Sequence, residues 1–180
     1  LKETNPFSQE VYAQKGALLE SVVCAEYSPQ LQADILHLAD IKLHEPILDI
    51  GCGQNAGLVK FLRENNLDAY GIDRFPAHLS YTQKADWLTY EYGAEKWGLV
   101  ISNLGFSNHF IHHHLREDGN FEEYARKYME ILRSLKIHGS FCYAPDLPFI
   151  EKYLDPQSYE LSKYGIPGLS FQATIVKRIR

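Results

Sequence analysis

The sequence predicts an α/β fold with a mostly parallel sheet. Short apolar runs typical of buried strands end at glycine or aspartate, and segments whose apolar residues recur at helical spacing separate them. Of the 180 residues, 45% are hydrophobic and 23% are charged, which is an ordinary globular composition. We therefore expect a single domain over residues 1–180, with a helical cap over 1–42 and a sheet core over 43–180.

Two helices are expected ahead of the first strand. Between Phe7 and Tyr27 the apolar residues recur at near-helical spacing. Ser28-Pro29 is typical of an N-cap followed by proline at the first helical position. After this cap, the helical stripe continues over Leu31, Ile35, Leu38 and Ala39.

Seven strands are expected, the last two paired as a hairpin. The first five are predicted at Ile47–Ile50, Ala69–Asp73, Tyr81–Ala85, Leu99–Ile101 and Ser140–Ala144. The hairpin segments are Tyr159–Tyr164 and Ser170–Lys177. Helices are expected between the strands. An apolar i, i+3, i+4 pattern marks one over residues 58–62, and the longest begins at Asn120, with Glu123 as its capping-box partner and Gly139 as its stop.

Charge and cysteine content narrow the class of protein. With Lys+Arg 18 and Asp+Glu 23, the net charge is −5, whereas proteins that bind duplexes usually carry a basic excess, so a nucleic-acid partner is disfavoured. Cys24, Cys52 and Cys142 show no zinc or redox spacing, which fits a reducing cytoplasm. No apolar run approaches the roughly 20 residues of a membrane span, and no signal segment opens the chain, so we expect a cytoplasmic protein without a membrane partner.

A glycine turn and an acid favour a nucleoside-cofactor site. Residues 51–57 are mostly small and follow the first strand, where a helix N-terminus presents free N–H groups. Asp73 ends the next strand, 20 positions after Gly53, where a carboxylate can accept both hydroxyls of a ribose. A tight turn beside a solvated acid is the alternative interpretation.

Asp49 indicates the charge of the ligand. The turn also fits the GxGxxA variant of a dinucleotide fingerprint, through Gly51, Gly53 and Ala56. Asp49 precedes Gly51 by two residues, and its carboxylate would repel the pyrophosphate of NAD but attract a cationic amine or sulfonium. The sequence therefore favours a cationic adenosyl ligand over NAD.

Five segments together resemble the class I S-adenosylmethionine-dependent methyltransferases, over roughly residues 43–143. Ile47-Leu48-Asp49-Ile50-Gly51-Cys52-Gly53 resembles motif I of this family. The remaining matches, in chain order, are Gly71-Ile72-Asp73 with the motif II strand end, Ala85-Asp86-Trp87 with the third strand end, residues 97–103 with motif IV, and residues 135–141 with the "LKPGG" entry to the fifth strand.

The resemblance implies a Rossmann-like, seven-stranded sheet that closes with an antiparallel hairpin, and S-adenosylmethionine as cofactor. It places Asp49 and the glycine turn at the methionine part, Asp73 at the ribose, Asp86 at the adenine amino group and Trp87 on the adenine ring. The complete expected cofactor set is Asp49, Gly51, Cys52, Gly53, Asn55, Asp73, Arg74, Asp86, Trp87, Asn103 and Leu104.

The sequence departs from the family pattern at three places. Asn55 stands where the family often has a third glycine, and asparagine tolerates left-handed backbone angles, so the turn can be kept. Ile137 and His138 replace the usual Pro-Gly at a helix end. Asn103-Leu104 is not followed by the Pro-Pro-aromatic signature of base N-methylation, so nucleobase acceptors are disfavoured.

Several side chains keep more than one interpretation. His109 and residues 112–114 could supply a general base, bind a metal or be incidental, and His109 is our catalytic candidate while no metal site is predicted. Trp87 could stack on adenine or fill space beneath a helix. Cys52 is expected to pack rather than react, and Tyr12 could close over the cofactor.

The function expected from these features is methyl transfer from S-adenosylmethionine to a small-molecule acceptor. The leading helices and residues 104–119 and 145–168 are short and lack motifs, so we expect them to shape the acceptor pocket. An NAD-dependent oxidoreductase and a non-catalytic S-adenosylmethionine-binding protein remain alternatives.

Overall fold

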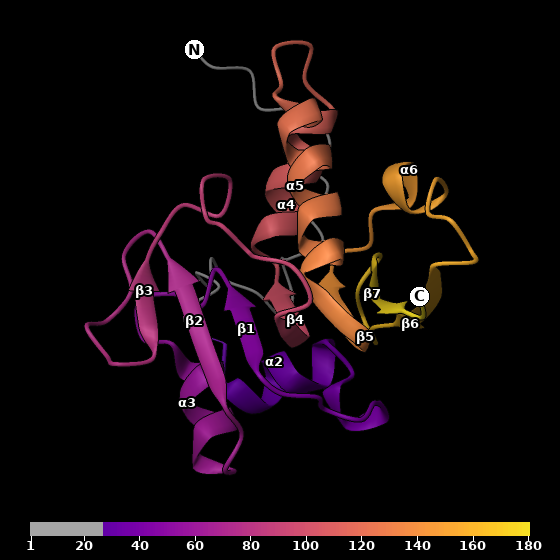
Figure 1. Cartoon of the computed structure of the whole chain (residues 1–180). Helices are drawn as coiled ribbons and strands as arrows, with labels where there is room; N and C mark the ends of the chain where they lie inside the picture. Colours follow the sequence, from indigo (N-terminus) through magenta and orange to yellow (C-terminus); the bar gives the residue numbers. More distant parts are fainter. Residues whose placement is uncertain (1–26) are drawn as a thin grey trace.

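The computed structural model describes residues 27–180, which form a seven-stranded sheet with helices on both faces (Figure 1). The strands are β1 (Ile47–Ile50), β2 (Ala69–Asp73), β3 (Thr82–Lys84), β4 (Trp97–Asn103), β5 (Leu135–Ala144), β6 (Tyr159–Gly165) and β7 (Gln172–Arg178). The helices are α2 (Pro29–Ile35), η3 (Leu38–Asp40), α3 (Gly57–Glu64), α4 (Phe106–His114), α5 (Phe121–Ser134) and α6 (Pro148–Glu151). The helix expected between Phe7 and Tyr27 lies almost entirely outside the described residues, and so does Tyr12.

The strand order confirms the predicted fold class. The order is β3-β2-β1-β4-β5-β7-β6; β1 to β5 run parallel, and β7 lies antiparallel between β5 and β6. Chain order reverses at β1, which has β2 on one side and β4 on the other. In open α/β sheets, ligands bind outside the carboxyl ends of the strands at such a reversal.

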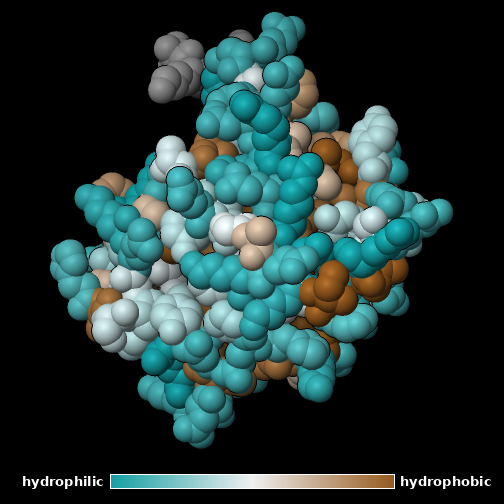
Figure 2. Space-filling model, in the orientation of Figure 1, coloured by the Kyte–Doolittle hydropathy of each residue, from teal (hydrophilic) through white to brown (hydrophobic). Residues whose placement is uncertain are grey.

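The centre of the sheet is buried on both faces, which explains why β1 and β4 are mostly continuous apolar runs. Leu48, Ile50 and Val100 pack on the face covered by α4 and α5. Ile47 and Ile101 pack on the opposite face, covered by α2 and α3, and Figure 1 shows the two helix pairs on opposite sides of the sheet. The face of the molecule in Figure 2 is mostly hydrophilic, with apolar surface gathered beside the C-terminal strands.

The predicted start of α2 is confirmed, whereas the limits predicted for the longest helix are partly wrong. Ser28 Oγ accepts a hydrogen bond from Leu31 N at 3.2 Å. Asn120 does precede α5, but its side chain donates to Glu123 instead of capping the backbone. The helix ends at Ser134, and Gly139 lies inside β5, where a Cβ would come within 2.9 Å of a β4 backbone oxygen. Gly139 therefore permits close strand contact, not a helix stop.

The remaining predicted strands are present, two of them longer than expected. β4 begins two residues and β5 five residues earlier than predicted, and the hairpin of β6 and β7 is confirmed. No helix in residues 27–180 is long and apolar enough to cross a membrane.

Candidate functional site

The predicted site residues gather at the carboxyl edge of the parallel strands. Asp49 lies in β1, Asp73 ends β2, and Asn103 ends β4. The others occupy segments that leave this edge: Gly51, Cys52, Gly53 and Asn55 after β1, Arg74 after β2, Asp86 and Trp87 after β3, Leu104 after β4, and His109 on α4.

Left-handed residues shape the turn after β1. Gly51 has φ 77° and Gly53 has φ 72°, backbone angles that favour glycine. Gly51 N and Cys52 N donate to Ile72 O at 2.8 and 3.1 Å, so the turn is attached to β2. The third left-handed residue is Ala56, with φ 47°, and not Asn55. The tolerance of asparagine for such angles is therefore not what keeps the turn.

Asp73 links the end of β2 to the glycine turn. Its Oδ2 accepts a hydrogen bond from Gly53 N at 3.1 Å, and its Oδ1 accepts one from Phe75 N at 2.9 Å. The carboxylate is partly buried. The structure therefore places this acid directly beside the turn, as the sequence spacing predicted, although whether it binds a ribose stays a prediction.

Asp49 and Asn103 carry buried polar atoms without partners among the described residues. Asp49 is 3% exposed and its Oδ2 accepts no hydrogen bond; Asn103 is 5% exposed and both its amide atoms are unpaired. Asp49 pairs in register with Ile101, two residues before Asn103, so both side chains project to the same face of the sheet. Leaving such groups unpaired costs roughly 1–3 kcal/mol each, so a ligand that pairs with them gains affinity.

The electrostatics of Asp49 suit a cationic ligand. Burial, with the neighbouring Asp73 carboxylate, raises the pKa of Asp49 to about 7. The nearby Cys52 thiol does not share this chemistry. Its Sγ would lie 2.7 Å from a Cβ on Gly71, and burial raises the pKa of the thiol, so Cys52 packs against β2 and is no nucleophile.

Trp87 lies directly against the glycine turn. Its Cζ3 would be 3.3 Å from a Cβ on Gly51, and the residue is 9% exposed. The His109 ring meets Trp87 edge-on at 5.0 Å between centroids, and the Arg74 guanidinium lies 5.8 Å from the Trp87 ring centroid. Trp87 thus packs in the core beneath α4, with its ring directly against the glycine turn. Asp86 is exposed, and its Oδ1 accepts a hydrogen bond from Leu88 N.

The four histidines of α4 have separate partners. His112 Nε2 lies 3.2 Å from Arg116, His113 stacks on Tyr124, and His114 stacks on Phe149 at 3.9 Å between centroids. No group of three or more metal-ligating side chains occurs in the described part of the chain. Only His109 reaches the site, where burial and the Arg74 charge lower its pKa.

The sequence analysis did not identify Ser102, whose side chain connects two of the segments that form the site. Its Oγ donates to Ile50 O at 2.9 Å and accepts from Phe106 N at 3.1 Å, joining the end of β1 to the start of α4. The one indication in the sequence was a serine that directly follows the apolar residues of β4. Leu104, with φ 56°, donates from its N–H to Ala144 O at 2.8 Å and so ties the ends of β4 and β5 together.

The fold is that of the class I S-adenosylmethionine-dependent methyltransferases, as the resemblance implied. The chain is similar to a TehB-like methyltransferase from Corynebacterium glutamicum, with 21% identity, a TM-score of 0.56 and coverage of 98% of this chain and 100% of that one. It is also similar to the N-methyltransferase NodS of Bradyrhizobium japonicum, solved with S-adenosylhomocysteine, with 14% identity, a TM-score of 0.58 and coverage of 95% and 97%. No protein-family model and no curated protein matches the sequence.

A third solved structure carries a small-molecule ligand. It is the 1,6-didemethyltoxoflavin N1-methyltransferase of Burkholderia thailandensis, bound to 1,6-didemethyltoxoflavin and S-adenosylhomocysteine. Identity is 14% and the TM-score 0.56, and the match covers 97% of this chain and 86% of that one. At these identities, the likeness shows the fold.

Proposed function

We propose that the protein is an S-adenosylmethionine-dependent methyltransferase that acts on a small-molecule acceptor. The observation that carries this proposal is the unpaired, buried carboxylate oxygen of Asp49 beside a left-handed glycine turn, at the point where strand order reverses. The fold adds support, because similar structures were solved with S-adenosylhomocysteine.

The residues present fit this cofactor. When bound, S-adenosylmethionine supplies a methyl group activated by a sulfonium. An ionised Asp49 and the Asn103 amide would hold its cationic methionine part, since both have unpaired buried polar atoms. Asp73 would accept the ribose hydroxyls. The Trp87 ring would contact the adenine, and the lack of side chains at Gly51 and Gly53 would let the ligand approach the backbone closely.

The protein would position the substrate that accepts the methyl group, and His109 would act as the general base that takes a proton from this substrate. Because burial lowers its pKa, His109 is neutral at pH 7 and can take a proton from an acceptor. The main contribution of the other residues is orientation, which brings the acceptor atom and the methyl group into line. An NAD-dependent oxidoreductase is less compatible, because the buried Asp49 carboxylate would face a pyrophosphate.

Titration calorimetry with S-adenosylhomocysteine and NAD tests the cofactor. We expect wild-type protein to bind S-adenosylhomocysteine and not NAD. Asp73→Ala should bind roughly 30- to 1000-fold more weakly, because two charge-assisted hydrogen bonds are lost. Asp68→Ala is the matched control, since Asp68 is an exposed acid next to the other end of β2. NAD that competes with comparable affinity, or an Asp73→Ala affinity within about threefold of wild type, would contradict the proposal.

A methyl-transfer assay separates an enzyme from a binding protein. Purified protein is incubated with methyl-labelled S-adenosylmethionine and a panel of small acceptors, and labelled product is counted. Transfer that depends on Asp49 and Asp73 would support catalysis. Tight cofactor binding without transfer to any acceptor would favour the non-catalytic alternative.

A further inference from the structure

A groove of about 600 Å³ opens at the same edge of the sheet as the proposed cofactor site. The carboxyl ends of β5 and β6 and the start of β7 meet there. Its lining includes Asp146, Ile166, Leu169, Ser170, Phe171 and Gln172. Among the described residues that line it, Asp146 alone carries a formal charge.

The groove begins close to the end of β4. Ala144, two residues before Asp146, accepts hydrogen bonds from Leu104 N at 2.8 Å and from Ser107 Oγ at 2.7 Å. Only β5 separates β4 from β7, so the β4 end and the groove are about 10 Å apart, two strand spacings. A molecule in the groove can therefore reach toward the residues proposed to hold the cofactor.

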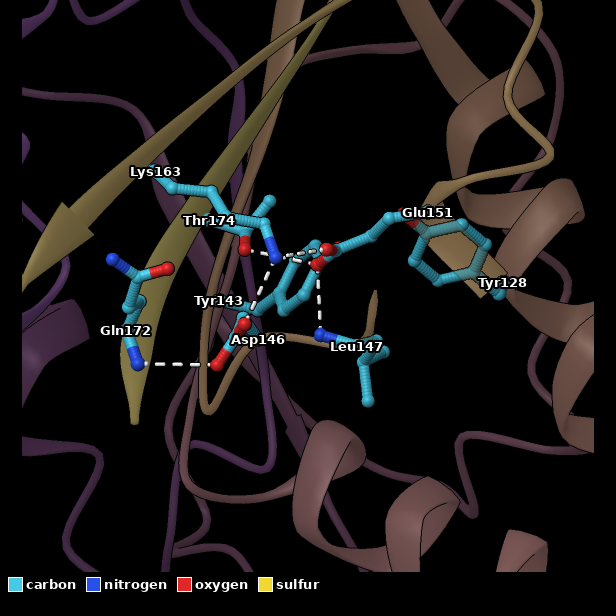
Figure 3. Close-up of polar contacts among 8 residues, drawn as sticks. All are labelled: Tyr128, Tyr143, Asp146, Leu147, Glu151, Lys163, Gln172 and Thr174. Carbon is cyan, nitrogen blue, oxygen red and sulfur yellow. Dashed lines mark hydrogen bonds and ion pairs between the residues drawn. The ribbon is translucent and has the colours of Figure 1, made fainter. Parts of the chain in front are cut away.

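The buried carboxylate of Glu151 lies in a cluster of polar contacts that includes Asp146 (Figure 3). The side chain of Glu151 is 3% exposed. Its Oε1 accepts hydrogen bonds from Tyr143 OH at 2.8 Å, Leu147 N at 2.7 Å and Thr174 Oγ1 at 2.9 Å. These bonds join β5, α6 and β7, so Asp146, which lies between Tyr143 and Leu147 in the sequence, is held in place.

Lys163 is shared between two carboxylates. Its Nζ lies 2.7 Å from Glu151 Oε2 and 2.9 Å from Asp146 Oδ2, as Figure 3 shows. The other Asp146 oxygen accepts a hydrogen bond from Gln172 N at 3.1 Å. Within residues 27–180, no other cationic side chain lies at ion-pair distance from either acid. The cluster therefore has a net charge of −1, directed at the groove through Asp146.

We infer that this groove binds the methyl acceptor and that the acceptor carries a protonated amine that pairs with Asp146. One added positive charge would balance the buried Glu151 carboxylate and the partly buried Asp146 carboxylate against two cations. Ile166, Leu169 and Phe171 would contact the hydrocarbon part. A protonated amine has no lone pair, so it serves for recognition and a different atom of the acceptor is methylated. That the bound molecule is the methyl acceptor rests on the proposed function, whereas its protonated amine is inferred from the groove alone.

Phenethylamine and 2-phenylethanol test the inference, because they differ mainly in charge. Each is titrated by NMR into protein saturated with S-adenosylhomocysteine, following the backbone amides of Gly165, Ser170 and Gln172. We expect phenethylamine to bind at least about tenfold more tightly than the alcohol and to shift these amides. Asp146→Asn should lose about tenfold in amine affinity while the Glu151–Lys163 pair stays intact.

Two further variants keep the test decisive. Ser170→Lys places a cation on the groove at an exposed position and should weaken amine binding without disturbing the buried cluster. Glu160→Gln removes the same unit of charge from an exposed position on β6 outside this groove, and should leave amine affinity unchanged. Equal binding of amine and alcohol, no binding of either, or amine binding indifferent to Asp146→Asn and Ser170→Lys would overturn the inference.

Failure of the proposed function is separable from failure of the amine preference. If S-adenosylhomocysteine does not bind, the cofactor proposal fails, and the same amine titration on ligand-free protein still tests the groove. If S-adenosylhomocysteine binds and the amine preference is absent, only the inference about the acceptor fails.

Discussion

In the proposed cofactor site, the Asp49 carboxyl group would couple ligand binding to its own protonation. It is buried at the end of β1 with one oxygen unpaired among the described residues, and its pKa is raised to about 7 by burial and by Asp73. Near neutral pH the group is therefore distributed between its neutral and ionised forms. Only the ionised form attracts a cationic amine or sulfonium, so the pH should control affinity through this one residue.

We predict that S-adenosylhomocysteine affinity rises with pH up to about 7 and then levels off. Below that value the affinity should fall by at most about tenfold per pH unit, because a proton must leave Asp49 on binding. Asp49→Asn should bind more weakly at pH 8 and show a flattened profile. Calorimetry between about pH 5.5 and about pH 8.5 measures this, and an equally steep profile in Asp49→Asn would assign the effect to another group.

The raised pKa of Asp49 affects the stability of the ligand-free protein in the opposite direction: stability should fall as pH rises, whereas ligand affinity should increase. Because the pKa of Asp49 is higher in the folded state than its ordinary value of 3.8, the folded state holds the proton more tightly. The contribution of Asp49 to the free energy of unfolding should therefore decrease as pH rises from about 4 to about 7, by roughly 4 kcal/mol in total. Urea unfolding of Asp49→Asn should lack this decrease.

The turn between β1 and α3 depends on its backbone as much as on its side chains. Gly51 and Gly53 have left-handed φ angles, and Gly51 lies against the Trp87 ring. The turn receives further support from Asp73, which accepts the Gly53 N–H. A side chain at Gly51 or Gly53 would therefore strain the backbone and, under the proposed function, also obstruct the approach of the cofactor.

We predict that Gly53→Val abolishes S-adenosylhomocysteine binding while the protein stays folded. The matched control is Gly93→Val: Gly93 has φ 78°, similar to the 72° of Gly53, but lies in the β3–β4 connection. Both variants should lose about 1–2 kcal/mol of stability from backbone strain. Only Gly53→Val should lose cofactor affinity. Circular dichroism and calorimetry compare the two, and wild-type affinity in Gly53→Val would show that the turn is not the binding element.

Across the whole molecule, one buried network holds the C-terminal third together. Glu151 contacts β5 through Tyr143, β7 through Thr174 and β6 through Lys163. Tyr143 also meets Tyr128 of α5, with 2.9 Å between their hydroxyl oxygens. The antiparallel hairpin, the last parallel strand and two helices therefore share a single buried carboxylate.

We predict that Glu151→Leu destabilises the protein by about 3–5 kcal/mol, because the Tyr143, Thr174 and Leu147 donors lose their common acceptor and a buried ion pair is broken. Glu151→Gln keeps one acceptor oxygen and should cost less. Glu160→Gln, on the exposed side of β6, serves as the surface control. Urea unfolding measures all three. A Glu151→Leu loss below about 1 kcal/mol would show that the network is not a main source of stability.

Local patterns in the sequence were sufficient to predict the sheet and most of the candidate site. Buried parallel strands are continuous apolar runs, so β1, β2 and β4 were visible locally, and parallel strands must present their carboxyl ends at one edge. Asp49, the glycine turn and Asp73 could therefore be assigned to one site from their positions along the chain. The cap of α2 was equally local, because Ser28 bonds to a residue three positions away.

The features that depend on contacts between distant parts of the chain became visible only in the folded molecule. α5 ends at Ser134, not at Gly139, because β5 already pairs with β4 there and Gly139 is needed where the two backbones approach. Lys163 joins Asp146 and Glu151 because the hairpin returns β6 to the sheet edge, which brings charges 12 and 17 positions apart in the sequence into one cluster. The spacing of residues along the sequence does not predict these ion pairs, because the charges attract one another strongly only after folding has brought them together and excluded water.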